Sequence, residues 1–350
     1  ATMEFILKSN KRPDIIHCHD WQTGLVPVLL YEIYARLGMD RQRIVYTIHN
    51  FKHQGITGEA VLWATGLCRP EYYFHHDRLL DNFNHTAINL MKGGIVYSNY
   101  VNTVSPHHSW EARFSDQGYG LEQTLAIHHY KFGGILNGVD YDVWNPEIDR
   151  FIPSHYNVWN MEGKYGNKDA LRDRLWLRKE YKPIVAYVGR LDAQKGVHLI
   201  QHAMFYALER GAQFVLLGAG GDRGINEQLA QLLYAGADIC VVPSLFEPCG
   251  LAQMIAMRYG SIPVVRGVGG LVDTVFDRDH SDRRLEERNG YVFHDADFRG
   301  IESALSRAIG LWFDYPKDFR RLMSNAMSAD YSWGQSGGHY LAVYEETRCR

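Results

Sequence analysis

The fold is decided by the stretch Pro183-Ile-Val-Ala-Tyr-Val-Gly-Arg-Leu-Asp-Ala-Gln-Lys-Gly196. Its first six residues are mostly apolar and β-branched, which is typical of a fully buried strand. A polar loop with Arg190 and Lys195 follows, and the pattern up to Glu209 predicts a helix that begins near Gly196. A buried strand followed by a helix is half of a βαβ unit, from which parallel sheets are built.

The same alternation runs along the chain on both sides of this stretch. Further buried strands are predicted at Asp14–His17, Arg43–His49, Val101–Val104, Phe132–Leu136, Phe214–Leu217, Ile239–Pro243, Ser261–Val265 and Gly290–Phe293. Helical patterns separate them, for example Thr23–Leu37, Glu227–Ala235 and Gly250–Arg258. The stretch Asn137–Asn167 breaks the rhythm and is predicted to connect two domains. Two doubly wound α/β domains with a cleft between them follow, with ligands expected outside the carboxyl ends of the strands.

The composition excludes several classes of protein. With 350 residues the chain is long enough for two domains, and a formal net charge of −3 argues against a nucleic-acid-binding or membrane-surface protein. Five widely spaced cysteines without a CxxC pair fit a reducing compartment and indicate neither a disulfide framework nor a zinc site. No apolar run reaches transmembrane length, and we expect no signal peptide. The aromatic share of 13% suits a sugar-binding cleft as well as a tyrosine-rich core.

The loop that follows Gly189 carries two cations at the carboxyl end of a strand. Arg190 offers a planar fork of donors and Lys195 a point charge, a combination that can clamp a diphosphate. The alternative is a solvated loop in which these cations pair with Asp192.

A second loop of this kind lies in Pro243-Ser-Leu-Phe-Glu-Pro-Cys-Gly-Leu-Ala-Gln-Met254. Gly250 is expected to open a helix whose free amides can hold a phosphate. Glu247 either accepts hydrogen bonds from sugar hydroxyls or is an ordinary acidic residue at a helix start. Cys249 is interpreted as a small packing residue and not as a nucleophile, because no histidine lies near it in sequence.

Histidines mark the ends of two neighbouring strands in the first domain. They belong to His17-Cys-His-Asp-Trp21 and to Tyr46-Thr-Ile-His-Asn50, one βα unit later. Side chains alternate along a strand, so the two histidines of the first run face away from Cys18 and Asp20 and no metal site is expected. His49 is predicted either to point into a cleft or to be a half-buried, hydrogen-bonded histidine.

Short motifs occur in order over nearly the whole chain: His17-Cys-His-Asp-Trp21, Tyr46-Thr-Ile-His-Asn50, Thr103-Val-Ser-Pro106, Gly134-Ile-Leu-Asn-Gly-Val-Asp140, Val188-Gly-Arg-Leu-Asp192, Gln194-Lys-Gly196, Phe246-Glu-Pro-Cys-Gly-Leu251 and Gly269-Gly-Leu-Val-Asp-Thr274. This set resembles the bacterial and plant glycogen and starch synthases, a family of retaining glucosyltransferases (glycosyltransferase family 5). The resemblance implies the GT-B fold, in which two doubly wound Rossmann-like α/β domains face a cleft. Residues 1–138 would form the acceptor-side domain, residues 139–330 the nucleotide-sugar domain, and residues 331–350 a helix that crosses back to the first domain.

The resemblance also implies the reaction and its partners. Glucose would move from ADP-glucose to the non-reducing end of an α-1,4-glucan, such as glycogen, starch or a maltooligosaccharide, with retention of configuration. No metal and no other cofactor would take part, and no nucleic acid or membrane is expected as a partner. The expected location is the cytoplasm of a bacterium, or the plastid stroma of a plant or alga.

Site residues are implied in the same way. Arg190 and Lys195 would hold the diphosphate and stabilise it as it leaves. The donor would further be bound by Glu247, Gly189, Cys249, Gly250 and Leu251, with His49 and Asn137 reaching the glucose from the first domain and Asp20 lining the acceptor side. We favour attack on the leaving-group face over a covalent intermediate, because the sequence shows no obvious nucleophile.

The chain departs from the family pattern in three places. The N-terminal region with a Lys-x-Gly-Gly-Leu loop is absent, so the first domain is expected to lack its first strands. Between Gly220 and Gly224 the chain is shorter by about one βα unit. Ile225 occupies the position of an aromatic residue that commonly covers the nucleotide base, and Ala252 replaces a threonine.

Two alternatives remain beside the family's reaction. One is a GT-B enzyme with a small or lipid-linked acceptor, and the other is an inactive glucan-binding or scaffold protein. Asp277-Arg-Asp279 resembles the DxD metal motif of the other major glycosyltransferase architecture. It lies in the charged run Asp277–Arg288, which is predicted to be a solvated loop, so the tripeptide is set aside as a chance match.

Overall fold

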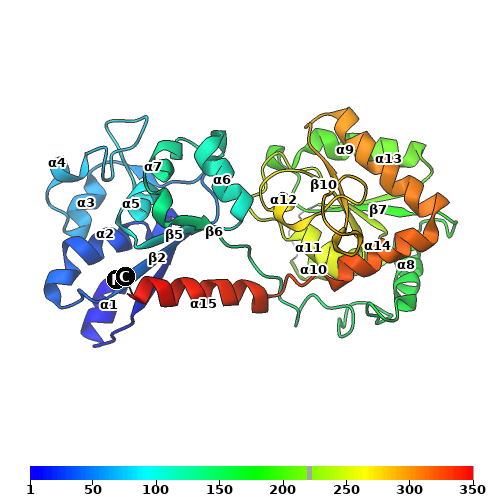
Figure 1. Ribbon diagram of the computed structural model, residues 1–350, viewed down its shortest axis with the longest axis horizontal. Coiled ribbons are helices and arrows are strands. Elements are labelled where there is room, and N and C mark those ends of the chain that lie inside the picture. The colour runs from blue at the N-terminus through cyan, green and yellow to red at the C-terminus, as the bar shows by residue number, and fades with distance from the viewer. Residues whose placement is uncertain (219–222, 350) are drawn as a thin grey trace. The chain divides into compact units, whose positions relative to one another are not determined.

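The computed structural model describes residues 1–218 and 223–349, and of residues 223–226 it describes the backbone only. The chain forms two compact units, Ala1–Leu136 with Ser336–Arg350, and Asn137–Gln335 (Figure 1). The second unit begins two residues before the predicted boundary, because the N–H of Val139 bonds the C=O of Tyr331 at 2.7 Å. Across the described residues, no helix combines the length and the apolar character that crossing a membrane requires.

The sheet of the first unit has four parallel strands in the order β1-β2-β5-β6. These strands are β1 Ile15–His19, β2 Arg43–Ile48, β5 Tyr100–Thr103 and β6 Phe132–Gly134, and a small antiparallel ribbon pairs β3 Ile56–Thr57 with β4 Ile88–Asn89. The helices are α1 Thr2–Lys8, α2 Leu25–Glu32, α3 Ala60–Thr65, α4 Pro70–Tyr73, α5 Leu90–Tyr97, α6 Pro106–Phe114, α7 Glu122–Ile127 and the last part of α15 Trp333–Cys349. The four predicted strands are confirmed. The predicted helix Thr23–Leu37 is divided, since α2 ends at Glu32 and a separate 3₁₀ turn covers Tyr34–Leu37.

The sheet of the second unit has five parallel strands in the order β11-β10-β9-β7-β8. They are β7 Ile184–Val188, β8 Gln213–Leu217, β9 Ile239–Val242, β10 Ile262–Arg266 and β11 Tyr291–Phe293, as predicted to within about a residue at each end. The helices are α8 Glu162–Arg174, α9 Val197–Glu209, α10 Arg223–Gly236, α11 Ala252–Arg258, α12 Gly270–Thr274, α13 Phe298–Asp314 and α14 Pro316–Ser328. α9 and α13 lie on one side of the sheet, and α10, α11 and α14 lie on the other (Figure 1). This is a doubly wound sheet whose order reverses between β7 and β9.

The irregular connection between the domains is shorter than predicted. α8 begins at Glu162, whereas the sequence predicts irregular structure as far as Asn167. Lys164 in the first turn is buried, and its Nζ donates to backbone carbonyls at the end of α10 and to the C=O of Tyr259 at 2.8 Å. Asn167 is also buried and bonds both the N–H and the C=O of Ser154. The polar residues that are typical of a loop are therefore part of the buried face of a helix.

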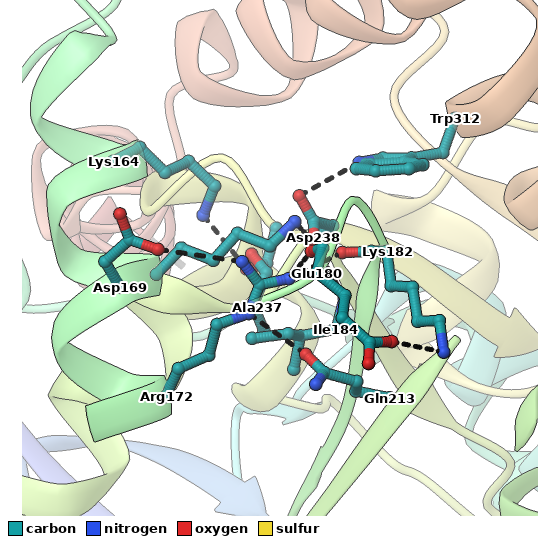
Figure 2. Close-up of polar contacts among 12 residues, drawn as sticks. Lys164, Asp169, Arg172, Glu180, Lys182, Ile184, Gln213, Ala237, Asp238 and Trp312 are labelled. Carbon is teal, nitrogen blue, oxygen red and sulfur yellow. Dashed lines mark hydrogen bonds and ion pairs between the residues drawn. The ribbon is translucent and has the colours of Figure 1, made fainter. Parts of the chain in front are cut away.

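A buried carboxylate ties the amino end of this sheet to its helices. Asp238, just before β9, accepts hydrogen bonds from Lys168 Nζ at 2.7 Å, from the N–H of Ile184 at 2.7 Å and from the indole N–H of Trp312 at 3.1 Å (Figure 2). Burial lowers the pKa of Lys168, and the charge of Asp238 opposes that shift. One side chain thus joins α8, β7 and α13.

We expect Asp238→Asn to lower the free energy of unfolding of the second unit by about 3–5 kcal/mol, because Lys168 would be left as a buried charge without its partner. Urea unfolding followed by circular dichroism measures the change. Asp173→Asn is the matched control, since Asp173 and its partner Lys179 are both more than half exposed and such pairs contribute about 0–1 kcal/mol. Equal effects of the two substitutions would contradict the prediction.

Candidate active site

Two loops meet at the carboxyl ends of β7 and β9, where the strand order reverses. Residues 189–196 follow β7, and residues 243–251 follow β9. In doubly wound sheets this switch point is where ligands bind. Lys195 and Glu247, which the sequence identifies as candidate ligand-binding residues, come from these two loops.

Gln194 fastens one loop to the other. Its C=O accepts from the N–H of Leu245 at 2.8 Å and of Phe246 at 3.4 Å, and its side-chain amide donates to the C=O of Phe246 at 3.1 Å. Gly196 allows the close approach, because it has a φ of +69° and a Cβ there would lie 2.5 Å from the C=O of Pro243. Sequence reasoning gave Gln194 no role, since these bonds join residues about 50 positions apart.

The paired loops bring a lysine and a carboxylate into contact. Lys195 Nζ lies 2.5 Å from Glu247 Oε2, and Ser244 Oγ donates to the same oxygen at 2.7 Å. The side chains of Lys195 and Glu247 are 20% and 10% exposed, so the pair is largely shielded from solvent. Within the part of the chain that the structure describes, Glu247 Oε1 has no hydrogen-bond partner. The site therefore offers a fixed cation and a carboxylate oxygen that can accept from a ligand. Sequence reasoning missed Ser244, although it stands only three residues before Glu247.

Arg190 lies in the same loop but does not join this pair. Its guanidinium is 3.2 Å from the carboxylate of Asp192 and its side chain is 67% exposed, as in the solvated alternative that the sequence left open. The carboxylate of Asp192 also accepts from the N–H of Lys195 and so shapes the loop. An exposed ion pair contributes at most about 1 kcal/mol, so Arg190 can exchange Asp192 for a phosphate at little cost.

The segment after Glu247 packs against the glycines at the start of α12. The N–H of Gly270 bonds the C=O of Glu247 at 3.1 Å, and a Cβ on Gly270 would lie 2.0 Å from the C=O of Cys249. Cys249 is buried, and burial raises the pKa of its thiol to about 12, which confirms the packing interpretation. The predicted helix start at Gly250 is wrong by two residues. Gly250 has a φ of +74° and forms a turn, Leu251 follows it, and α11 begins only at Ala252.

Three further residues that the sequence assigns to the donor are Asn137, Gly189 and Ile225. The sequence predicts Asn137 in the first domain, and this is wrong: Asn137 is the first residue of the second unit, where its backbone bonds the thiol of Cys249. Gly189 directly follows β7, and its N–H bonds the C=O of Leu217 at 3.0 Å. Ile225 falls outside the residues whose side chains are described, so its position beneath a base stays a prediction.

Three histidines form a row at the carboxyl ends of β1 and β2. His17 and His19 stack with ring centroids 4.2 Å apart, which confirms that they share one face of β1. His19 Nδ1 lies 3.0 Å from His49 Nε2. His17 bonds Thr47 Oγ1 and the hydroxyl of Tyr344 on α15, each at 2.7 Å. His49 is half-buried and hydrogen-bonded, as the second interpretation holds, and its position in a cleft stays a prediction.

Asp20 holds the backbone of His49. Its Oδ1 accepts from the N–H of His49 at 2.8 Å, and its own N–H bonds the C=O of Thr47 at 3.0 Å. Asp20 has a φ of +54°, a strained conformation for a residue other than glycine. Strain of this kind is concentrated at functional sites.

The histidine row predicts a loss of stability in acid. Burial, assisted by the charges of His19 and His49, lowers the pKa of His17 from 6.5 to about 4. Between these pH values the unfolded chain binds a proton that the folded chain does not, so stability is present above pH 6.5 and is lost as the pH falls toward 4.

We expect His17→Gln to reduce the loss of stability between pH 7 and pH 5 by about 1–2 kcal/mol, allowing for solvent screening. Thermal unfolding midpoints of the variant and the unmodified chain at both pH values measure this difference. His75→Gln is the control, because His75 is more than half exposed. The same pH dependence in all three proteins would rule out His17 as the titrating group.

The carboxylates of Asp277 and Asp279 are occupied by a neighbouring arginine. Arg307 lies 2.8 Å from Asp277 and 2.9 Å from Asp279, and Asp277 also accepts from the N–H of Val292 at 2.7 Å. Among the described residues, no cluster of three or more His, Cys, Asp or Glu side chains is arranged to hold a metal ion.

The chain matches known proteins over its whole length. Residues 1–127 match the family described as starch synthase catalytic domain, and residues 182–310 match glycosyl transferases group 1. Glycogen synthase 1 of Synechococcus sp. (strain JA-3-3Ab) is 60% identical over 100% of this chain and 76% of its own length. Glycogen synthase 2 of Methylococcus capsulatus is 61% identical over 99% of this chain and 76% of its own length. The catalytic domain of starch synthase IV from Arabidopsis thaliana, solved with ADP and acarbose, matches with a TM-score of 0.93 at 41% identity, covering 100% of this chain and 76% of that one.

Proposed function

Since this chain belongs to the glycogen and starch synthase family of GT-B glycosyltransferases, we propose that it transfers glucose from ADP-glucose to the non-reducing end of an α-1,4-glucan with retention of configuration. The observation that carries the proposal is the ion pair of Lys195 and Glu247 at the switch point of the second unit. The cytoplasm as the site of the reaction rests on the bacterial sources of these relatives.

The charges that develop during the reaction match this pair. Breaking the bond between the sugar C1 and the phosphate oxygen places negative charge on the diphosphate and positive charge on the ring. We assign Lys195 to the diphosphate, since an ammonium has three donors and Glu247 uses only one of them. Arg190 also binds the diphosphate, after its guanidinium exchanges the carboxylate of Asp192 for a phosphate. Lys195 is held by Glu247 before the reaction and needs no reorganisation as the charge develops, and we propose that these cations act without a metal ion.

Glu247 and the backbone that follows it are assigned to the donor glucose. The carboxylate accepts hydrogen bonds from sugar hydroxyls and stabilises the positive charge that develops on the ring. The amides of Cys249, Gly250 and Leu251 lie close to it in the chain, and Gly189 directly follows the neighbouring strand β7; we assign them to sugar and phosphate. In the first unit, His49 is assigned to the glucose and Asp20 to the acceptor side, while Asn137 contributes from the second unit.

Retention of configuration is assigned to attack on the face of the leaving group. Cys249 is excluded as a covalent nucleophile, because its buried thiol stays protonated with a pKa of about 12. As the bond from C1 to the diphosphate breaks, a bond forms from C1 to the acceptor hydroxyl oxygen. The proton of that hydroxyl passes to the departing phosphate oxygen.

Incubation of the full chain with radiolabelled ADP-glucose and maltooligosaccharides tests the function. We expect label in longer chains that an exo-acting α-1,4-glucan hydrolase releases again. Label in a small or lipid-linked acceptor only would favour another GT-B activity. Binding of maltooligosaccharide without transfer would favour an inactive glucan-binding protein.

The choice of nucleotide tests the role of Ile225. Ile225 gives apolar contact without the π-face of the usual aromatic residue, so we expect ADP-glucose to be preferred over UDP-glucose by a modest ratio. Ile225→Tyr should strengthen ADP-glucose binding by about 0.5–1.5 kcal/mol. The measurement is kcat/KM for both donors in both proteins, and an unchanged donor ratio would show that residue 225 does not contact the base.

A further inference from the structure

Two adjoining cavities lie in the second unit away from the switch point, at the β11 edge of the sheet. One has a volume of about 380 Å³ and lies beside Tyr291 of β11, Arg307 of α13 and the start of α14. The other has a volume of about 350 Å³ and reaches along α14 to Arg321. They adjoin because Arg278, Asp279 and Asp318 line both of them. Their volumes lie in the range of small-molecule sites.

The lining of these cavities is rich in arginine. Arg278, Arg288, Arg307 and Arg321 contribute to it. Three carboxylates pair with them: Asp279 with Arg278 and Arg307, Asp277 with Arg307, and Asp318 with Arg321. Arg288 donates to the backbone C=O of Arg283 and of Arg278, and within the described residues it has no carboxylate partner. Arginine presents a planar set of donors that fits phosphate.

Two buried donors at the first cavity have no acceptor. The hydroxyl of Tyr291 and the Nε of Arg307 have no hydrogen-bond partner within the described residues, although Tyr291 is fully buried. Burial raises the pKa of Tyr291, so its hydroxyl keeps its proton. Buried polar groups in folded proteins are nearly always paired, so unpaired ones call for an explanation. Since both groups are donors, the missing partner is a group that accepts.

We propose that the two cavities form a binding site for a small phosphate ester, with its phosphoryl group against Arg278, Arg307 and Arg321. A phosphoryl group supplies acceptors for the unpaired donors, and its charge balances Arg288, the arginine of the described lining that no carboxylate pairs. Asp279, Asp318 and Ser306 then face the organic part of the ester, where carboxylates and a hydroxyl can bind its hydroxyl groups. A hexose phosphate is the class of ligand that combines these features. The site is separate from the Lys195–Glu247 pair.

Calorimetric titration of the full chain with fructose 6-phosphate, inorganic phosphate and fructose tests this proposal. We expect fructose 6-phosphate to bind with a Kd in the millimolar range or below, inorganic phosphate to bind more weakly, and fructose not to bind. The double substitution Arg278→Gln, Arg321→Gln should weaken binding of fructose 6-phosphate about 10-fold or more, because charge-assisted hydrogen bonds are lost. Arg284→Gln is the matched control, an exposed arginine of the same charged run that does not line either cavity.

Further variants keep the test decisive. If the double variant does not fold, Arg321→Gln alone serves, because that side chain is 65% exposed and its ion pair is local. Lys195→Ala should leave the affinity for fructose 6-phosphate unchanged. The proposal is overturned by a lack of binding up to about 10 mM, by equal affinity in the arginine variants, or by loss of binding in Lys195→Ala.

Discussion

We expect Glu247→Gln to lower kcat by about 100-fold or more while ADP-glucose affinity changes much less. Glutamine keeps the shape of the side chain and can still accept from Lys195 and Ser244, which both bond Oε2 in the structure. It loses the negative charge that stabilises the positive charge on the sugar ring. That positive charge develops only near the transition state. The effect should therefore fall on turnover. Steady-state kinetics with maltooligosaccharide acceptors measures it.

Two controls separate this charge from general disturbance of the site. Ser244→Ala removes one hydrogen bond from the same oxygen and keeps the charge, so we expect a loss of only several-fold, corresponding to about 1 kcal/mol. Glu209→Gln changes an exposed glutamate at the end of α9 and should have no effect. Turnover close to that of the unmodified enzyme in Glu247→Gln would remove Glu247 from the mechanism.

We expect Lys195→Ala to lower kcat by about 100–1,000-fold and also to weaken binding of ADP-glucose. The lysine is assigned to the diphosphate in both the ground state and the transition state, so both constants should change. Its removal also leaves Glu247, which is 10% exposed, without its cation. Lys195→Arg should restore part of the activity, since the charge returns with a different shape. Lys179→Ala, at an exposed lysine paired with Asp173, is the control.

Chelation of divalent ions tests whether a metal takes part in the reaction. If Lys195 and Arg190 supply the positive charge, chelation with EDTA should leave the activity of the unmodified enzyme largely intact. Strict dependence on an added divalent ion would contradict this assignment. It would also make Asp277 and Asp279 candidate metal ligands, although their carboxylates pair with Arg307 in the structure.

Much of the fold could be predicted because it depends on local patterns. Short apolar runs in the sequence predict buried strands, and the strands of both parallel sheets could be located in this way. Polar residues misled the prediction where tertiary contacts satisfy them. Lys164 and Asn167 look like loop residues until the carbonyls that they bond are known. The predicted start of α11 was also wrong, because Gly250 forms a turn and the helix begins only at Ala252.

The sequence predicted which residues belong to the candidate site, but it did not predict the contacts between them. Lys195 and Glu247 were identified as ligand-binding, but their mutual ion pair joins loops that are distant in sequence. The same holds for Gln194, whose bonds to Leu245 and Phe246 exist only once β7 and β9 are neighbours. The partner of Arg190 could not be decided, because charge alone allowed both a phosphate and Asp192. Contacts across the sheet require the strand order, which no local pattern contains.

The backbone conformation of Asp20 carries a local cost in stability. A glycine at this position would adopt the φ of +54° without the steric penalty of a Cβ, which is on the order of 1–2 kcal/mol. It would also lack the carboxylate that fixes the N–H of His49. On our proposal that Asp20 and His49 act in the reaction, selection for stability and selection for catalysis favour different residues at this position. A stabilised variant of this enzyme should accordingly be sought at other positions, because relief of this strain would release the histidine that it holds.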